Sequence, residues 1–160
     1  MWSTLIAVLG TLAGVALASA TQLLTARRDR DRQHHQDVVD AADALLAAVL
    51  SYRELYWLRT DSIRAGEPDP TDRAAVYAAR SAVTRARDRL ALVTDEAALV
   101  DASQDAAWSA IDLSEIHLGS PVDGRFAPEV EAQLDAGREI SRDAHTDLRE
   151  AVTAYVHRRR

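Results

Sequence analysis

The sequence predicts an all-α protein in which a single N-terminal transmembrane helix precedes an antiparallel four-helix bundle or coiled-coil body. Three observations lead to this prediction. Residues 1–26 contain no charged side chain, and an arginine-rich cluster follows directly at residues 27–32. Beyond the cluster, apolar residues recur with the period of an α-helix between glycine and proline stop signals. We therefore divide the chain into a membrane anchor, residues 1–26, and a helical body, residues 27–160.

The predicted anchor is longer than the roughly 20 apolar residues that cross a bilayer core as a helix. Aromatic residues favour the membrane interfaces, and basic residues favour the cytoplasmic side of the membrane. We expect Met1 outside the cell and the body in the cytoplasm, at the bacterial cell membrane. The residues predicted to lie at the interfaces of this anchor are Trp2, Arg27, Arg28, Arg30 and Arg32.

Two other interpretations of the first segment remain open. Ala18-Ser19-Ala20 matches the cleavage pattern of a signal peptide, which would leave a secreted helical domain. No basic residue precedes the apolar run, however, and the arginines that follow it would resist translocation. An ordinary buried helix is disfavoured because the apolar residues cover its whole circumference.

Small residues form a stripe along the predicted anchor. Gly10, Gly14 and Ala18 recur every four residues, so they line one face where a second helix could approach closely. Such packing would produce a homo-oligomer within the membrane. The alternative is that these residues simply face lipid, because Gly and Ala are common in membrane helices.

Charge and cysteine content exclude several classes of function. The chain has no cysteine, which excludes disulfides, thiolate metal sites and cysteine nucleophiles. Its 19 basic residues are all arginine, a bias typical of GC-rich bacteria such as actinobacteria. Residues 33–157 contain 12 arginines against 23 acids, a net charge of −11, whereas both flanks are basic. We expect no nucleic-acid partner, because phosphate backbones repel an acidic body.

The first half of the body predicts two amphipathic helices. One runs from about residue 27 to residue 65 and ends at Gly66, with Pro68 and Pro70 beyond it. The other starts near residues 69–71 and ends near Val93. The apolar positions that we expect to face the core are Val38, Ala41, Leu45, Ala48, Tyr52 and Leu55 in the first, and Val76, Ala79, Val83, Ala86, Leu90 and Val93 in the second.

The second half of the body predicts a helix over residues 94–118 with Thr94 as its N-cap, and another from Pro128 to the C-terminus. In the last helix Val130, Leu134, Ile140, Leu148, Val152 and Tyr155 should face inward. The third helix contains six acids and no arginine. Its acidic side predicts a partner-binding surface made by Trp108, Asp101, Asp105 and Asp112. The Trp108 indole either stacks on an arginine of the same chain or awaits a protein partner.

An up-down-up-down order of four helices returns the C-terminus to the end where the body begins. The basic tail formed by Arg158, Arg159 and Arg160 would then lie near the arginines of residues 27–32. Both basic ends could face the anionic lipid head groups, while the acidic body points away from the bilayer.

The sequence contains no motif that predicts catalysis, a cofactor or a metal ion. His34 and His35 are adjacent, so they do not form the i, i+4 pair of a helical metal site. Asp31 and His35 have the spacing of a ligand pair, but an exposed ion pair is the simpler interpretation. Phosphate-binding glycine loops, nucleophile elbows and lysines are absent. We therefore do not expect an enzyme.

The first 16 residues, MWSTLIAVLGTLAGVA, resemble the start of KilB-type small membrane proteins of conjugative plasmids and integrated elements in Streptomyces and its relatives. Chain length, the arginine-rich flank and the alanine-rich body are also similar. The resemblance implies an accessory role in plasmid transfer or spread, without catalytic residues. We expect a non-enzymatic, membrane-anchored, self-associating scaffold with a possible protein partner. A membrane-perturbing or pore-forming subunit is the alternative, although the anchor has few polar residues to line water.

Overall fold

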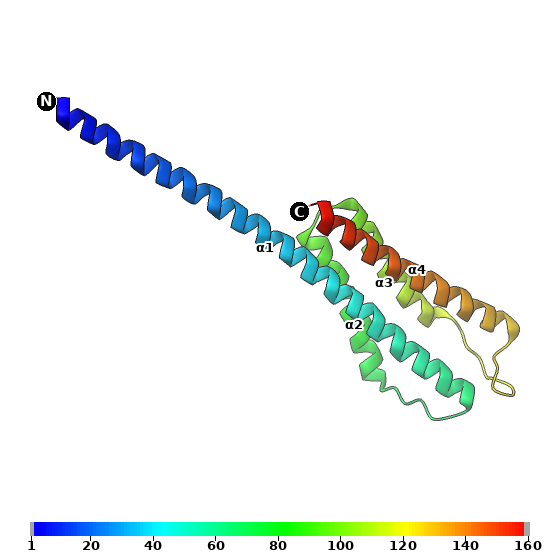
Figure 1. Cartoon of the computed structure of the whole chain (residues 1–160). Helices are drawn as coiled ribbons and strands as arrows, with labels where there is room; N and C mark the ends of the chain where they lie inside the picture. The colour runs from blue at the N-terminus through cyan, green and yellow to red at the C-terminus, as the bar shows by residue number, and fades with distance from the viewer. Residues whose placement is uncertain (1, 159–160) are drawn as a thin grey trace. The chain divides into compact units, whose positions relative to one another are not determined.

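The computed structural model describes residues 2–158, except for the side chains of residues 2–21, 23 and 24. The prediction of an all-α fold is confirmed. Four long helices follow one another, with a short 3₁₀ helix, Leu113–Glu115, after the third (Figure 1). They are α1 (Trp2–Ala65), α2 (Arg73–Val93), α3 (Ala97–Asp112) and α4 (Pro128–Arg158). The chain divides into two compact units, residues 1–37 and residues 38–160.

The first unit consists of the N-terminal part of α1. The side chains of its arginine cluster are exposed, and Arg32 forms a 3.8 Å ion pair with Asp29 one turn earlier. Within the part of the chain that the structure describes, no helix has the length and apolarity needed to cross a bilayer. The predicted anchor, with Trp2, Gly10, Gly14 and Ala18, lies outside the described side chains. Arg159 and Arg160 are likewise outside the described residues.

The second unit is a helical body with one main core. All four helices contribute fully buried side chains to it, because each helix has an apolar face with helical spacing. The largest of these side chains are Val38, Leu45, Val49 and Tyr52 from α1, Val83 and Leu90 from α2, Leu99 from α3, and Leu148 and Tyr155 from α4. A second cluster, Tyr56, Leu113, Phe126 and Leu134, lies below the loop that joins α3 to α4.

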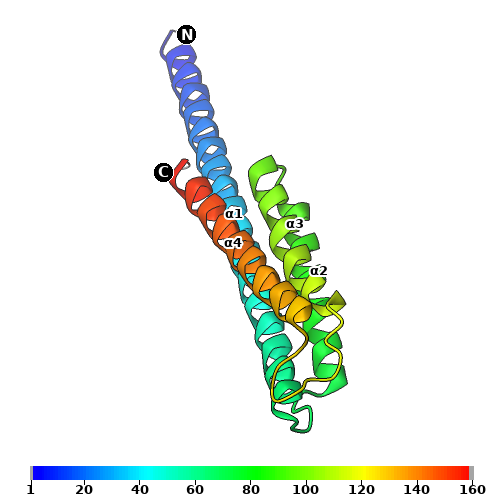
Figure 2. The same ribbon diagram turned by 90° about the vertical axis from the view of Figure 1, so that its right-hand side faces the viewer.

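The helices of the body pack in pairs, and the contacts between them show that neighbours are antiparallel. At the end of α1, Arg64 donates a 2.8 Å hydrogen bond to Glu131 in the first turn of α4. Earlier in α1, Trp57 lies under Arg138, which is about two turns beyond Glu131 along α4. On the other side of α4, Arg158 at its C-terminus pairs with Glu96 just before α3, at 2.9 Å. The same alternation of direction is visible in Figure 2.

Glu131 fixes the start of α4. Its two carboxylate oxygens accept hydrogen bonds from the backbone N–H of Phe126 at 3.0 Å and from the Arg64 guanidinium. The Phe126 N–H, followed by the charge of Arg64, holds the pKa of Glu131 below its ordinary value. The Arg64 guanidinium also lies 5.4 Å from the Phe126 ring centroid. One carboxylate thus joins the loop, the end of α1 and the first turn of α4.

Local signals explain most helix ends. Gly66, which follows α1, adopts a φ of +69°, a conformation that glycine reaches without strain. Asp72 caps α2 by accepting a hydrogen bond from the N–H of Ala74. The prediction of Thr94 as N-cap of the next helix is wrong, because Thr94 closes α2 and α3 begins at Ala97. The Thr94 hydroxyl accepts instead from the N–H of Glu96, which stabilises the sharp connection between the two helices.

Helix α4 approaches α3 closely through small residues. A Cβ built on Gly137 would lie 2.8 Å from a methyl of Leu113, so the missing side chain leaves room for the leucine. The prediction that Ile140 faces the core is wrong, since 61% of its surface is exposed. Position 140 is one residue out of step with the buried row Leu134, Ser141, Ala144 and Leu148, so a serine takes the core position.

Two buried serines provide a matched test of core polarity. Ser103 donates a 2.7 Å hydrogen bond to the carbonyl of Val100, whereas the Ser141 hydroxyl has no partner among the described residues. Both substitutions to Ala gain the same helix propensity. The difference between the free energies of unfolding of the two variants therefore reports the hydrogen bond that Ser103 makes and Ser141 lacks. We expect Ser141→Ala to raise the free energy of unfolding relative to Ser103→Ala by about 1 kcal/mol. Urea denaturation followed by tryptophan fluorescence measures it; equal stabilities would contradict the assignment.

Candidate functional site

An acidic groove between α3 and α4 is the first candidate for a functional surface. It has a volume of about 480 Å³ and is lined by four aspartates together with a tryptophan and an isoleucine. The aspartates are Asp105 and Asp112 on α3 and Asp143 and Asp147 on α4. Asp143 lies 3.8 Å from Arg142 of its own helix, but the other three form no ion pair with any residue that the structure describes.

Trp108 and Ile140 provide the apolar part of this groove. They are 49% and 61% exposed. The guanidinium of Arg87 on α2 lies 5.1 Å from the Trp108 ring centroid, and Arg87 also pairs with Asp88 at 2.6 Å. The intramolecular stack expected as one alternative for Trp108 is therefore present on one side of the indole. The Trp108 side chain also lines the acidic groove.

The structure brings together most of the residues predicted to bind a partner. Trp108, Asp105 and Asp112 line the groove, while Asp101 is exposed on α3 outside it. Asp143 and Asp147 were not predicted because the acidic surface was expected on the third helix alone, and Ile140 was expected in the core. Their spacing along α4, at positions 140, 143 and 147, places them on one helical face, and that pattern could have identified them.

A basic face on the opposite flank of α4 is the second candidate. It is formed by Arg53 of α1 and by Arg138, Arg142, His145 and Arg149 of α4. Arg138 stacks on Trp57 at 4.3 Å, and the Nε of Arg53 is buried without a hydrogen-bond partner among the described residues. Burial, and then the charges of Arg142 and Arg138, lowers the pKa of Arg53. Mutual repulsion among these cations is thus part of the folded state.

The C-terminal end of α4 lies at the end of the body where residue 38 enters. The Arg158–Glu96 pair places it beside the start of α3, and Val38, Leu99 and Tyr155 belong to one core cluster. Of the predicted basic tail, only Arg158 is described, and more than half of its side chain is exposed. For residues 38–158, the sequence-based prediction that the last helix returns to the start of the body agrees with this geometry.

In the described part of the chain, no cluster of three or more histidine, aspartate or glutamate side chains is placed to hold a metal ion.

Comparison with known proteins identifies a related protein family. The family described as KilB plasmid transfer protein matches residues 39–156. The chain belongs to this family. A KilB protein from Streptomyces lividans is 41% identical over 87 residues, which cover 52% of this chain and 59% of that relative. No solved structure gives a significant match. The matched residues of this KilB-family chain coincide with the compact helical body, so the α3–α4 groove and the basic face both lie within the family region.

His145 should make stability depend on pH. Burial, followed by the charges of Arg53 and Arg149, holds its pKa below the ordinary value of about 6.5. As pH falls, His145 binds a proton in the unfolded chain before it does so in the folded protein. Its contribution to the free energy of unfolding is therefore fully present above about pH 6.5 and is lost as pH falls toward its pKa in the folded protein. Urea titrations at pH 7.5 and pH 5 should show a smaller loss for His145→Gln than for wild type. His117→Gln, at an exposed position, is the control and should behave as wild type; an unchanged loss in His145→Gln would contradict the assignment.

Proposed function

We propose that this protein is a non-enzymatic, membrane-anchored helical scaffold that assists plasmid transfer or spread in an actinobacterium. Membership of the KilB plasmid transfer protein family supports the biological setting. The observation on which the proposal depends is the presence of two surfaces of opposite charge on one helical body. The groove exposes unpaired carboxylates around apolar side chains, and the other flank of α4 exposes arginines that repel one another.

The anchor part of the proposal rests on the sequence. Residues 1–26 are uncharged and end at the exposed arginines of residues 27–32. In the body, α4 returns to the end where residue 38 enters, so Arg158 is at the same end as the entry point. We propose that this end faces the cytoplasmic side of the membrane and that the antiparallel four-helix bundle extends into the cytoplasm.

Self-association follows from the two charged faces. The groove offers Asp105, Asp112 and Asp147 without an ion pair to any described residue, and the basic face of a second copy would supply arginines. Long-range attraction between such surfaces favours encounter, and the apolar Trp108 and Ile140 would lose exposed surface in the contact. Because the two faces differ, the contact is heterologous and continues from copy to copy until a ring closes or a row forms.

Charge exchange tests this contact. A groove variant, Asp105→Arg with Asp147→Arg, and a face variant, Arg142→Glu with Arg149→Glu, should each lose self-association, measured by energy transfer between labelled copies of the full chain in lipid vesicles. Mixed, they should associate again, since the two native faces and the two reversed faces are each complementary in charge. The control is Asp43→Arg with Glu67→Arg. Both residues are exposed and lie outside both surfaces, and the pair of substitutions changes the net charge by the same amount as the groove variant.

The outcome in cells should follow the same pattern. Each charge variant should lower transfer of the plasmid, and coexpression of both should restore part of it. Circular dichroism checks that the variants remain folded. Folded variants that associate like wild type would eliminate the proposed contact, whatever their effect on transfer.

Membrane topology is tested by cysteine labelling, because the chain has no cysteine of its own. One new cysteine replaces Ser3, and another replaces Ser120, which is exposed in the loop after α3. In intact cells an impermeant thiol reagent should label Ser3→Cys and leave Ser120→Cys unlabelled until the cells are opened. Labelling of Ser120→Cys in intact cells would place the body outside and exclude the cytoplasmic scaffold.

A further inference from the structure

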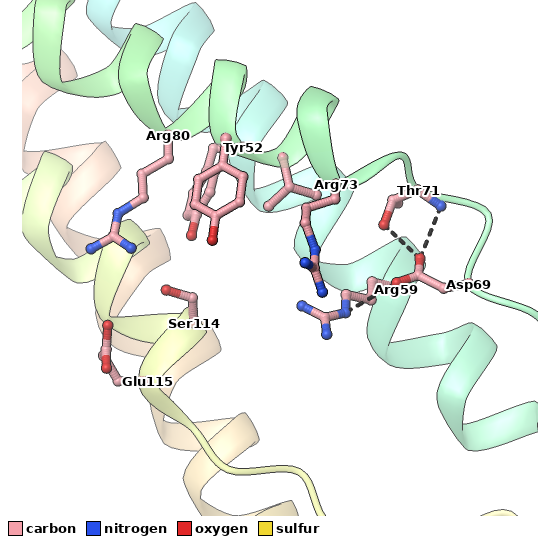
Figure 3. A pocket seen from close by; sticks show the side chains of 10 residues that line it. Tyr52, Arg59, Asp69, Thr71, Arg73, Arg80, Ser114 and Glu115 are labelled. Carbon is pink, nitrogen blue, oxygen red and sulfur yellow. Dashed lines mark hydrogen bonds and ion pairs between the residues drawn. The ribbon is translucent and has the colours of Figure 1, made fainter.

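An arginine-lined cleft lies where α1, α2 and the end of α3 meet. Its volume is about 450 Å³, and three arginines, Arg59, Arg73 and Arg80, take part in its wall. Figure 3 shows their guanidinium groups projecting into one space together with the hydroxyl of Tyr52. This accumulation of positive charge is unexpected in a body whose residues 33–157 have a net charge of −11.

One of the three arginines is held in place by the chain itself. Asp69 pairs with the Nε of Arg59 at 3.2 Å and accepts hydrogen bonds from the N–H and the hydroxyl of Thr71 at 2.9 and 2.5 Å. The Thr71 hydroxyl is the main reason why the pKa of Asp69 lies below its ordinary value, so this carboxylate stays ionised at neutral pH. Arg59 is therefore oriented at the edge of the cleft by a rigid acidic group.

The other two arginines have no such partner. Neither Arg73 nor Arg80 forms a side-chain hydrogen bond or an ion pair with any residue that the structure describes. Glu115 belongs to the same wall, but it too forms no ion pair with a described residue. Two guanidinium groups thus face a common volume with their donors available, which is the arrangement that recognises phosphate or carboxylate groups.

The distance between Arg73 and Arg80 and the volume of the cleft indicate the size of the ligand. Positions 73 and 80 are about 10 Å apart along α2, so a ligand that contacts both must be longer than one phosphate ion. The cleft volume lies within the range of small-molecule sites. The 63% exposed Tyr77 adds aromatic surface for a flat ring, whereas the ring of Tyr52 is buried in the core.

From this geometry we propose that the cleft binds a small organic phosphate with at least two negative charges and an aromatic ring, of the size of a nucleoside diphosphate. Arg73 and Arg80 bind the phosphate groups, and Tyr77 contacts the ring, while the charge of Arg59 is largely compensated by Asp69. Glu115 opposes binding because its carboxylate lies in the same wall as the arginines. The site uses neither the acidic groove nor the basic face, so it does not depend on the proposed self-association.

Isothermal titration calorimetry on the full chain tests the site with ADP, GDP, pyrophosphate and inorganic phosphate as probes. A nucleoside diphosphate should bind in a saturable way and more tightly than pyrophosphate, and inorganic phosphate should bind most weakly. Arg73→Ala and Arg80→Ala should each weaken binding of the nucleoside diphosphate roughly 10-fold or more, the effect of losing a charge-assisted hydrogen bond. Glu115→Gln should strengthen it.

Arg85→Ala is the matched control, because Arg85 is exposed on α2 outside the cleft. It should leave the affinity unchanged. Equal weakening by Arg85→Ala and Arg73→Ala would show a general charge effect and overturn the proposal. Absence of saturable binding by all four probes at millimolar concentration would also overturn it. Tighter binding of pyrophosphate than of either nucleotide would remove the aromatic ring from the proposed ligand.

Discussion

The close approach of α3 and α4 is the constraint on which the rest of the body depends. The side of α3 that faces the core is built from small residues, and Ala106, Ala107 and Ala110 are fully buried. On α4, Gly137 leaves space for Leu113, and Ala144 continues the same row. Two helices that meet through such small side chains exclude water over a narrow interface. Larger residues on α1 and α2, such as Tyr52 and Leu90, then fill the volume on the other side of α3.

This packing also determines where the charges go. Since the core side of α3 is occupied by small apolar residues, its carboxylates are confined to the outer side, where they meet Asp143 and Asp147 of α4. The other flank of α4 packs against α1 and presents arginines. One helix thus separates an acidic from a basic surface, and the two are fixed relative to each other by the same core. A change in the register of α4 would disturb both surfaces together.

Helical period and stop signals were sufficient to predict the four helices of the body and most of their buried positions. In α2 the predicted row is buried or packed against the core, as the uninterrupted heptad pattern indicates. The errors arose where two signals compete. Thr94 is a good N-cap residue, but the chain uses it to close α2; Ile140 is apolar, but Ser141 occupies the core position. The arginine cleft was not predicted because it joins residues from three separate segments, and no local pattern reports that proximity.

An anchor would change what these surfaces can achieve. Exposed ion pairs contribute only about 0–1 kcal/mol each, which is too little to hold two free proteins together. Much of the cost of association is the loss of translational and rotational freedom. Copies held in one membrane with the same orientation have already lost part of that freedom. Because both charged faces lie on the same middle turns of α4, neighbouring copies that stand side by side could bring a groove and a basic face together at the same height. In the proposed arrangement, weak lateral contacts between the bodies are therefore sufficient once the anchor has concentrated and aligned them.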